Sequence, residues 1–374
     1  MSADTGPEPD RVEGAPHPRD TCRLFGQTAA ETAFLTAFAS ERLHHAWLLN
    51  GPRGVGKATL AWRIARFLLA TPDHQEGGLF GAAPAMPDTL EIPADHPVAR
   101  RIHARAEPGL YHIRRTVNEK TGRLRDQILA ENVRDLNRFL GLSAADGGRR
   151  VVIIDAADEM NIQAANALLK MLEEPPARTT FLLVSHQPAR LLPTIRSRCR
   201  DLRLMPLDQQ DMQDALDQAG IEAGGQAAAL AQLSRGSAGE AVRLYNLDGL
   251  KIYGELVAIA ATLPQLDRPR AIQMAEAAAA RGAETRLDLL YALIDLFLSR
   301  LARAGATGIA PPETVPGEAE VIARLAPDQH AARRWAECAQ EIGARSRHGR
   351  AVNLDPAALV LDTVFKLQQA AQAV

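Results

Sequence analysis

The chain contains the sequence WLLNGPRGVGKAT at residues 47–59. Its first residues have the apolar character of a buried strand, the next part is rich in glycine, and a helical pattern of apolar residues follows from Leu60 to Leu69. Glycine lets backbone N–H groups close around phosphate oxygens, and the helix that follows presents its positive N-terminal end to them. The stretch therefore predicts a phosphate-binding loop between a strand and a helix.

One position of this loop departs from the motif. A serine or threonine normally follows the lysine and holds Mg²⁺ through its hydroxyl, but Ala58 stands there. Thr59 is rotated from that position by about 100° along the helix, which turns it away from the phosphate edge. We therefore expect weak nucleotide binding and poor hydrolysis. The expected nucleotide-binding residues of this stretch are Gly51, Gly54, Val55, Gly56, Lys57, Ala58 and Thr59.

Two further apolar runs end in polar residues. Residues 151–155 predict a buried parallel strand whose carboxyl end carries Asp155. Ligands bind at that end of open α/β sheets, and an aspartate there orders Mg²⁺ in P-loop proteins. The next residue is Ala156, where hydrolysing enzymes usually carry a glutamate that activates water. A strand at residues 179–185 ends at Ser185, whose hydroxyl is expected either to sense a nucleotide phosphate or to cap the next turn.

The composition is that of a globular protein without a global attraction to nucleic acid. The 374 residues are 46% hydrophobic and 24% charged, with a formal net charge of −2. Cys22, Cys199 and Cys338 are far apart, which provides no Cys-x-x-Cys zinc site and suits a reducing cytosol. No apolar run reaches the length of a transmembrane helix. We expect a cytoplasmic protein with no membrane partner.

The order of patterns predicts an α/β domain followed by helical domains. Strand and helix patterns alternate up to residue 206, which predicts a mostly parallel sheet flanked by helices. Beyond it only helical patterns remain. We expect a disordered arm at residues 1–20, because these residues are rich in Pro, Gly, Asp and Glu. A nucleotide-binding domain at 21–206, a small helical domain at 207–248 and a larger one at 249–374 complete the expected organisation.

The densest basic run of the chain lies within residues 100–125. It consists of Arg100, Arg101, Arg105, Arg114, Arg115, Lys120, Arg123 and Arg125. Such a run can contact phosphates, but a solvated face whose charge is balanced by acids is the simpler interpretation. The preceding residues, from 71 to about 108, have no clear apolar period and are expected to form a loop.

Together, four segments resemble the bacterial DNA polymerase III clamp-loader ATPase family. They are Gly51–Lys57, Val151–Asp155, the sequence NALLKMLEEPP at residues 166–176, and Ser197-Arg198-Cys199. The resemblance covers about residues 20–370, with its specific motifs between residues 45 and 200. It implies an AAA+ P-loop domain, a helical lid domain at 207–248 and a helical collar at 249–374 through which subunits assemble.

Within this family, the chain resembles the delta prime branch, which has lost hydrolysis, rather than the catalytic gamma/tau branch. Ala58 and Ala156 replace two catalytic positions, and Gly239 stands in the segment where catalytic relatives place a sensor-2 arginine. The resemblance implies ATP or ADP bound without efficient hydrolysis and a weakened Mg²⁺ site. Catalytic members also carry a zinc module, for which this chain lacks the cysteines, so no zinc and no other metal is expected.

The resemblance assigns a separate role to Arg198. It implies that this residue is an arginine finger, which stabilises the transition-state charge at the site of an adjacent gamma/tau subunit. The simpler alternative is that Arg198 pairs with a carboxylate. Further implied partners are the delta subunit and, through the complex, the sliding clamp and primed DNA.

These features lead to three functional hypotheses. The first is a clamp-loader subunit without hydrolysis of its own, which forms part of the DNA-directed DNA polymerase III holoenzyme, a nucleotidyltransferase. The second is a catalytically active, clamp-loader-type DNA-dependent ATPase that uses Lys57 and Asp155. A small-molecule P-loop kinase is the third, and the long helical C-terminal half disfavours it.

Overall fold

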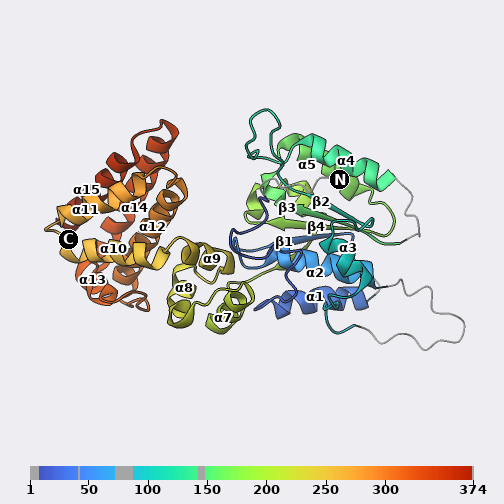
Figure 1. Cartoon of the computed structure of the whole chain (residues 1–374), viewed down its shortest axis with the longest axis horizontal. Helices are drawn as coiled ribbons and strands as arrows, with labels where there is room; N and C mark the ends of the chain where they lie inside the picture. The colour runs from blue at the N-terminus through green and yellow to red at the C-terminus, as the bar shows by residue number, and fades with distance from the viewer. Residues whose placement is uncertain (1–7, 41–42, 72–86, 142–147, 373–374) are drawn as a thin grey trace, which may run out of the picture. The chain divides into compact units, whose positions relative to one another are not determined.

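The computed structural model describes residues 8–40, 43–71, 87–141 and 148–372 (Figure 1). The chain divides into two compact units, Met1–Glu222 with Gly236–Val242, and Ala223–Arg235 with Arg243–Val374. The domain boundaries at residues 206 and 248 stay predictions.

A five-stranded sheet forms the centre of the first unit. Its strands are β1 (Ala46–Asn50), β2 (Leu110–Ile113), β3 (Arg150–Asp155), β4 (Thr179–Ser185) and β5 (Arg200–Arg203). Their order is β2-β3-β4-β1-β5, and every pair is parallel. Asn50 lies opposite Ser185, and Asp155 lies opposite Val184, so the carboxyl ends of three central strands meet at one edge. The α/β fold expected from the alternating patterns is confirmed.

Helices cover both faces of this sheet, as continuous apolar strands require. Leu48, Ile154 and Leu183 belong to one core cluster with the apolar sides of α4 (Ala130–Gly141) and α5 (Ile162–Glu173). On the other side, Phe34 of α1 (Thr28–Ala39) packs against Trp47 of β1, and Phe38 of α1 packs against Phe67 of α2 (Lys57–Ala70). Figure 1 shows α2 along the sheet. This arrangement fixes the glycine-rich loop between β1 and α2 at the strand ends.

Two elements of the first unit were not predicted. The strand β2 and the helix α3 (Pro97–His103) lie where a loop and a basic run were expected. β2 has 4 residues and is only partly buried at the sheet edge, so it has no continuous apolar pattern. The short α3 begins at Pro97, and the ring of His96 accepts a hydrogen bond from the N–H of Val98 at 3.3 Å. Residues 72–86 of the expected loop lie outside the described residues.

The N-terminal arm also differs from the expectation. Residues 8–20 pack against the first unit, and only residues 1–7 of the arm lie outside the described residues. The Asp10 carboxylate is 1% exposed and His17 is 2% exposed. The expectation of a disordered arm was wrong for residues 8–20, because it rested on the abundance of Pro, Gly, Asp and Glu in this segment. Composition does not show that the acids of the segment have basic partners elsewhere in the chain.

The rest of the first unit connects the strands. A short helix α6 (Pro193–Arg196) precedes β5, and α7 (Gln209–Gln218) follows it. The Asp208 side chain caps α7 by accepting a hydrogen bond from the N–H of Asp211 at 2.9 Å. Residues 236–242 of this unit include the start of α9 (Ala238–Asn246).

The second unit is helical, as predicted. Its helices are α8 (Ala227–Leu233), the end of α9, α10 (Gly249–Thr262), α11 (Arg268–Ala279), α12 (Glu284–Thr307), α13 (Glu318–Leu325), α14 (Gln329–Ala351) and α15 (Pro356–Gln372). The long α12 packs against α14, and α11 packs against α15. Tyr253 of α10, Phe297 of α12 and Trp335 of α14 are fully buried. Within the described residues, no helix is both long and apolar enough to cross a membrane.

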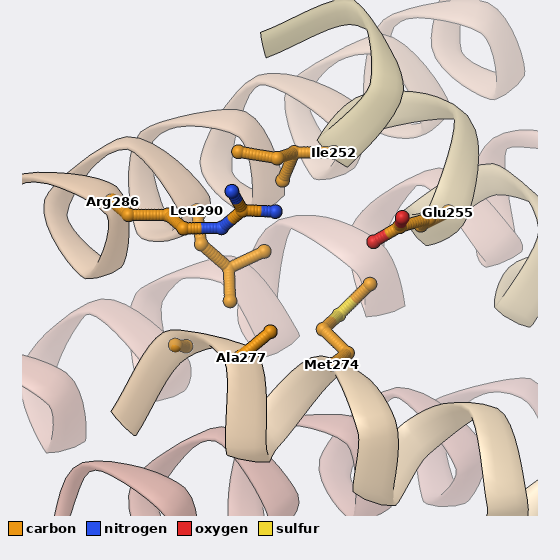
Figure 2. Close-up of a pocket in the computed structure, with 7 residues that line it drawn as sticks. Ile252, Glu255, Met274, Ala277, Arg286 and Leu290 are labelled. Carbon is orange, nitrogen blue, oxygen red and sulfur yellow. The ribbon is translucent and has the colours of Figure 1, made fainter. Parts of the chain in front are cut away.

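A small cavity lies between α10, α11 and α12 of this unit. In Figure 2, Arg286 and Glu255 extend from opposite sides of it toward Leu290 and Met274. Its volume is about 10 Å³. This is the space of a single water molecule, so the cavity is a packing feature and not a ligand site.

Candidate nucleotide-binding site

The glycines of the loop adopt backbone conformations that other residues rarely reach. Gly51, Gly54 and Gly56 have φ values of 147°, 77° and 99°. A Cβ on Gly51 would lie 2.5 Å from the carbonyl oxygen of Leu204, so a side chain there would also collide with the backbone. Gly56 directly precedes α2 and is followed by Lys57, the first residue of that helix. The predicted loop between strand and helix is confirmed.

Lys57 is turned onto its own loop. It is 3% exposed, and its ammonium donates hydrogen bonds to the carbonyl oxygen of Gly51 at 2.8 Å and to that of Pro52. Burial lowers the pKa of Lys57 to about 8, although the carboxylates of Asp155 and Asp158 oppose this shift. The lysine stays largely protonated at neutral pH, and its donors point at backbone oxygens that a bound phosphate would have to replace.

Asp155 lies at the carboxyl end of β3, as predicted. Burial raises its pKa to about 7, and the nearby carboxylates of Asp10 and Glu159 raise it further, whereas Lys57 lowers it. Neither acid that follows β3 is placed as a base for water. Asp158 accepts hydrogen bonds from the backbone N–H groups of His186 and Gln187 at 3.0 and 3.2 Å. Glu159 forms an ion pair with Arg115 at 2.8 Å.

The oxygen donors near Asp155 do not fit the Mg²⁺ site of a P-loop enzyme. Ala58 has no hydroxyl, and Thr59 is partly buried in the first turn of α2. Among the described residues, ligand atoms of Asp10, His112 and Asp155 lie within 4.8 Å of one another. However, both oxygens of Asp10 are already engaged, by Arg114 at 2.6 Å and by His17 at 2.7 Å.

Ser185 and its neighbour close the other side of the strand ends. Ser185 is fully buried, and its hydroxyl has no hydrogen-bond partner within the described residues. The next residue, His186, was not identified from the sequence. Burial lowers its pKa to about 4, helped by the charge of Lys57, so the imidazole is neutral. Because a histidine after a strand has no motif of its own, only the fold shows that it lies within the electrostatic field of Lys57.

Gly239 lies against the phosphate-binding loop. Its N–H donates a hydrogen bond to the carbonyl oxygen of Gly54 at 3.0 Å. A Cβ on Gly239 would lie 3.0 Å from the Cα of Gly54, which is tighter than ordinary side-chain contacts. The position at which catalytic relatives were expected to place an arginine is therefore occupied by backbone-to-backbone packing.

Arg198 follows the short helix α6 and contacts α5. One of its terminal nitrogens lies 2.8 Å from a carboxylate oxygen of Glu173, and the other donates to the carbonyl oxygen of Thr194 at 2.9 Å. The side chain is 35% exposed. Pairing with a carboxylate, the simpler alternative, is thus present in the isolated chain. The role as an arginine finger stays a prediction.

Five of the eight residues of the basic run have acidic partners. Arg101 pairs with Glu107 at 2.8 Å and Arg125 with Glu131 at 3.6 Å. Arg105 pairs with Glu8 of the N-terminal segment. These ion pairs, with those of Arg114 and Arg115 described above, support the interpretation of a charge-balanced surface rather than a dedicated nucleic-acid contact.

The raised pKa of Asp155 leads to a test by pH. The unfolded state ionises this residue near its ordinary value of 3.8, and the folded state only near 7, so stability is lost as the pH rises between these values. The full shift corresponds to roughly 4 kcal/mol, and partial exposure reduces the expected effect to about 2 kcal/mol. As the pH rises from 4 to 8, the unfolding free energy of Asp155→Asn should increase by this amount relative to that of the native chain. Urea denaturation without nucleotide checks it, and an unchanged difference across this range would contradict it.

The strand order, the glycine-rich loop after β1 and the aspartate at the end of β3 define the first unit as a P-loop domain of the AAA+ class. A family model described as "DNA polymerase III, delta subunit" matches residues 26–208. Residues 26–208 are thus similar to this family, and the match supports the resemblance of the chain's motifs to the delta prime branch of the DNA polymerase III clamp-loader family.

Individual relatives agree with this family. DNA polymerase III subunit delta' of Pseudomonas aeruginosa is 41% identical over 155 residues, which are 41% of each chain. The subunit delta' of Escherichia coli is 31% identical over 216 residues, or 57% of this chain and 58% of that protein. Subunit tau of Salmonella typhimurium is 29% identical over 280 residues, or 73% of this chain and 40% of that protein. The match thus spans about half the length of the delta' relatives.

Solved structures with similar chains were also found. A DNA polymerase III gamma subunit-related protein of Thermotoga maritima covers 91% of this chain and 99% of its own, with 17% identity and a TM-score of 0.39. The RuvB Holliday junction branch migration motor of the same organism covers 80% of this chain and 87% of its own, with 17% identity and a TM-score of 0.35.

Proposed function

We propose that the chain is the delta prime subunit of a DNA polymerase III clamp loader, which helps to place the sliding clamp on primed DNA. Its partners are gamma/tau and delta subunits and, through the assembled complex, the clamp and DNA. The family match of residues 26–208 and the named delta' and tau relatives support this role. The proposed location is the cytoplasm, together with the other replication proteins.

The proposed subunit retains a nucleotide-binding fold without efficient hydrolysis. The observation that carries this part is the loss of two catalytic positions, Ala58 and Ala156, in a site that keeps Lys57 and Asp155. Catalysis of phosphoryl transfer consists mainly of positioning and charge stabilisation, in which the metal and the water-orienting residue have central parts. A loop with these two alanines can contact ATP or ADP through backbone N–H groups and Lys57, but it lacks the groups that drive the reaction.

In the proposed complex, Arg198 acts at the site of a neighbouring gamma/tau subunit. Its guanidinium is partly exposed, and Glu173 and Thr194 hold it in one orientation. A planar guanidinium can bridge phosphate oxygens with two parallel hydrogen bonds. The contact with Glu173 orients the side chain before assembly, and a nucleotide phosphate of the neighbour then competes with that carboxylate.

ATP turnover of the purified chain tests the absence of hydrolysis. We expect no turnover above background with Mg²⁺ and primed DNA, and no change with Lys57→Ala, because the variant removes a phosphate contact and not an active catalytic group. Turnover by the isolated chain that Lys57→Ala abolishes would contradict this prediction. That result would instead support the alternative hypothesis that the chain is a catalytically active, DNA-dependent ATPase.

A further inference from the structure

The N-terminal segment 8–25 passes close to the phosphate-binding loop and to the residue that packs on it (dark blue in Figure 1). A methyl carbon of Val12 lies 3.4 Å from the position of a Cβ on Gly239, the residue whose N–H binds Gly54. At the other end of the segment, a methyl carbon of Leu24 lies 2.5 Å from the position of a Cβ on Gly56. Val12 thus lies beside the residue that packs on the loop, and Leu24, which follows residues 8–20, lies beside the loop itself.

Asp10 anchors this segment beside Asp155. One carboxylate oxygen of Asp10 lies 2.6 Å from Arg114, and the other lies 2.7 Å from His17. Burial by itself raises the pKa of Asp10, but the hydrogen bond from His17 and the positive charges nearby hold it well below its usual range. Asp10 is therefore ionised at neutral pH, and its negative charge lies within 4.8 Å of the ligand atom of Asp155.

Further contacts fix the segment to the surface of the first unit. Glu8 pairs with Arg19 at 3.0 Å and also with Arg105. Asp20 pairs with the ring of His103 at 2.7 Å. Arg66 of α2 donates to the carbonyl oxygen of Arg19 at 2.7 Å. The acids of the segment thus neutralise basic groups around α3 and β2 that would otherwise attract phosphates.

These contacts and a bound nucleotide make incompatible demands on the site. Independently of the segment, Lys57 must leave the carbonyl oxygens of Gly51 and Pro52 to reach a phosphate. A phosphate near Asp155 would also meet the ionised Asp10, and like charges at such short distances repel one another strongly in a poorly solvated site.

We propose that residues 8–20 form a strap that competes with nucleotide for the phosphate-binding loop. The strap is closed in the structure, held by Glu8, Asp10 and Asp20, and it opens when nucleotide binds. The proposal goes beyond the role in a clamp loader and does not depend on Arg198. Only the molecules with an open strap bind nucleotide. The apparent Kd is therefore the intrinsic Kd divided by the open fraction, so a mostly closed strap weakens binding.

Binding of a fluorescent ATP analogue, mant-ATP, to the full chain tests the strap. The variant Glu8→Ala/Asp10→Ala removes two anchors, and Asp95→Ala, which replaces an exposed acid outside the strap, is the matched control. We expect the double variant to bind about tenfold more tightly than the native chain, and the control to bind like the native chain. Equal or weaker binding by a double variant with native circular dichroism would overturn the proposal, as would a failure of both proteins to bind.

Proteolysis of the native chain provides a second readout that needs no variant. Trypsin cleaves after arginine, and the side chain of Arg19 is only 11% exposed in the closed strap. Because coupling between two binding events is reciprocal, nucleotide must favour the open strap if the strap opposes nucleotide. Saturating ATP should therefore accelerate cleavage after Arg19 several-fold. Unchanged cleavage would show that nucleotide does not affect the segment, and slower cleavage would show that the segment closes over the nucleotide. Either result would overturn the proposal.

Discussion

Replacing Arg198 by alanine should lower ATP hydrolysis at the neighbouring site of the assembled clamp loader by about a thousandfold. The guanidinium is the group that would stabilise the charge developing on the transferred phosphoryl oxygens, and alanine offers no substitute. The first turnover in a complex reconstituted with gamma/tau, delta, sliding clamp and primed DNA measures the effect. ATP sites of the complex that do not depend on Arg198 should keep their hydrolysis rates. The measurement must therefore distinguish the affected site from the total ATP hydrolysis of the complex.

Three companion variants separate a finger from a structural ion pair. Arg198→Lys keeps the charge without the planar fork and should recover little activity. Arg196→Ala, which removes an exposed arginine two residues earlier at the end of α6, is the matched control and should leave turnover unchanged. Glu173→Ala removes the carboxylate partner of Arg198 and should change turnover only slightly. Equal losses with Glu173→Ala and Arg198→Ala would show that their ion pair, and not a finger, is what the complex needs.

Replacing Glu318 by alanine should destabilise the second unit by about 3–5 kcal/mol, because it leaves a buried charge without its partner. Glu318 is 0% exposed, and one of its oxygens lies 2.7 Å from Arg300, itself 9% exposed. That oxygen also accepts from the hydroxyl of Tyr253 at 2.5 Å, and the other accepts from the N–H and hydroxyl of Thr314 at 2.8 and 2.6 Å. Removing the carboxylate leaves all these donors without an acceptor in the protein interior.

Hydrogen exchange of the full chain in increasing urea measures this loss separately for the two units. Amides of α12 and α13 should exchange through an opening whose free energy falls by the stated amount, while those of the sheet should keep their protection. Glu320→Ala, an exposed acid two residues further along α13, is the control and should cost less than about 0.5 kcal/mol. A loss below about 1 kcal/mol for Glu318→Ala would contradict the assignment of this residue as the centre of a buried polar network.

The elements with strong local signals were predictable. The apolar runs of β1, β3 and β4 can be buried only in a sheet covered on both faces, and the glycine spacing between β1 and α2 fits only a tight loop. The helical patterns of the C-terminal half correspond to α10–α15. β2 and α3 escaped prediction because a short, partly exposed edge strand and a helix of 7 residues have too few apolar positions to establish a period.

The sequence by itself determined which catalytic groups the site lacks. Folding cannot supply the hydroxyl missing at Ala58, the carboxylate missing at Ala156 or the guanidinium missing at Gly239. Only the tertiary structure decided where charge lies around the residues that remain. The Asp10 carboxylate reaches Arg114 across 104 positions of the chain, and no local pattern carries information about a contact at such a separation. The glycine-rich loop was therefore predictable from short-range geometry, whereas the strap beside it depends on long-range ion pairs that exist only once the chain has folded.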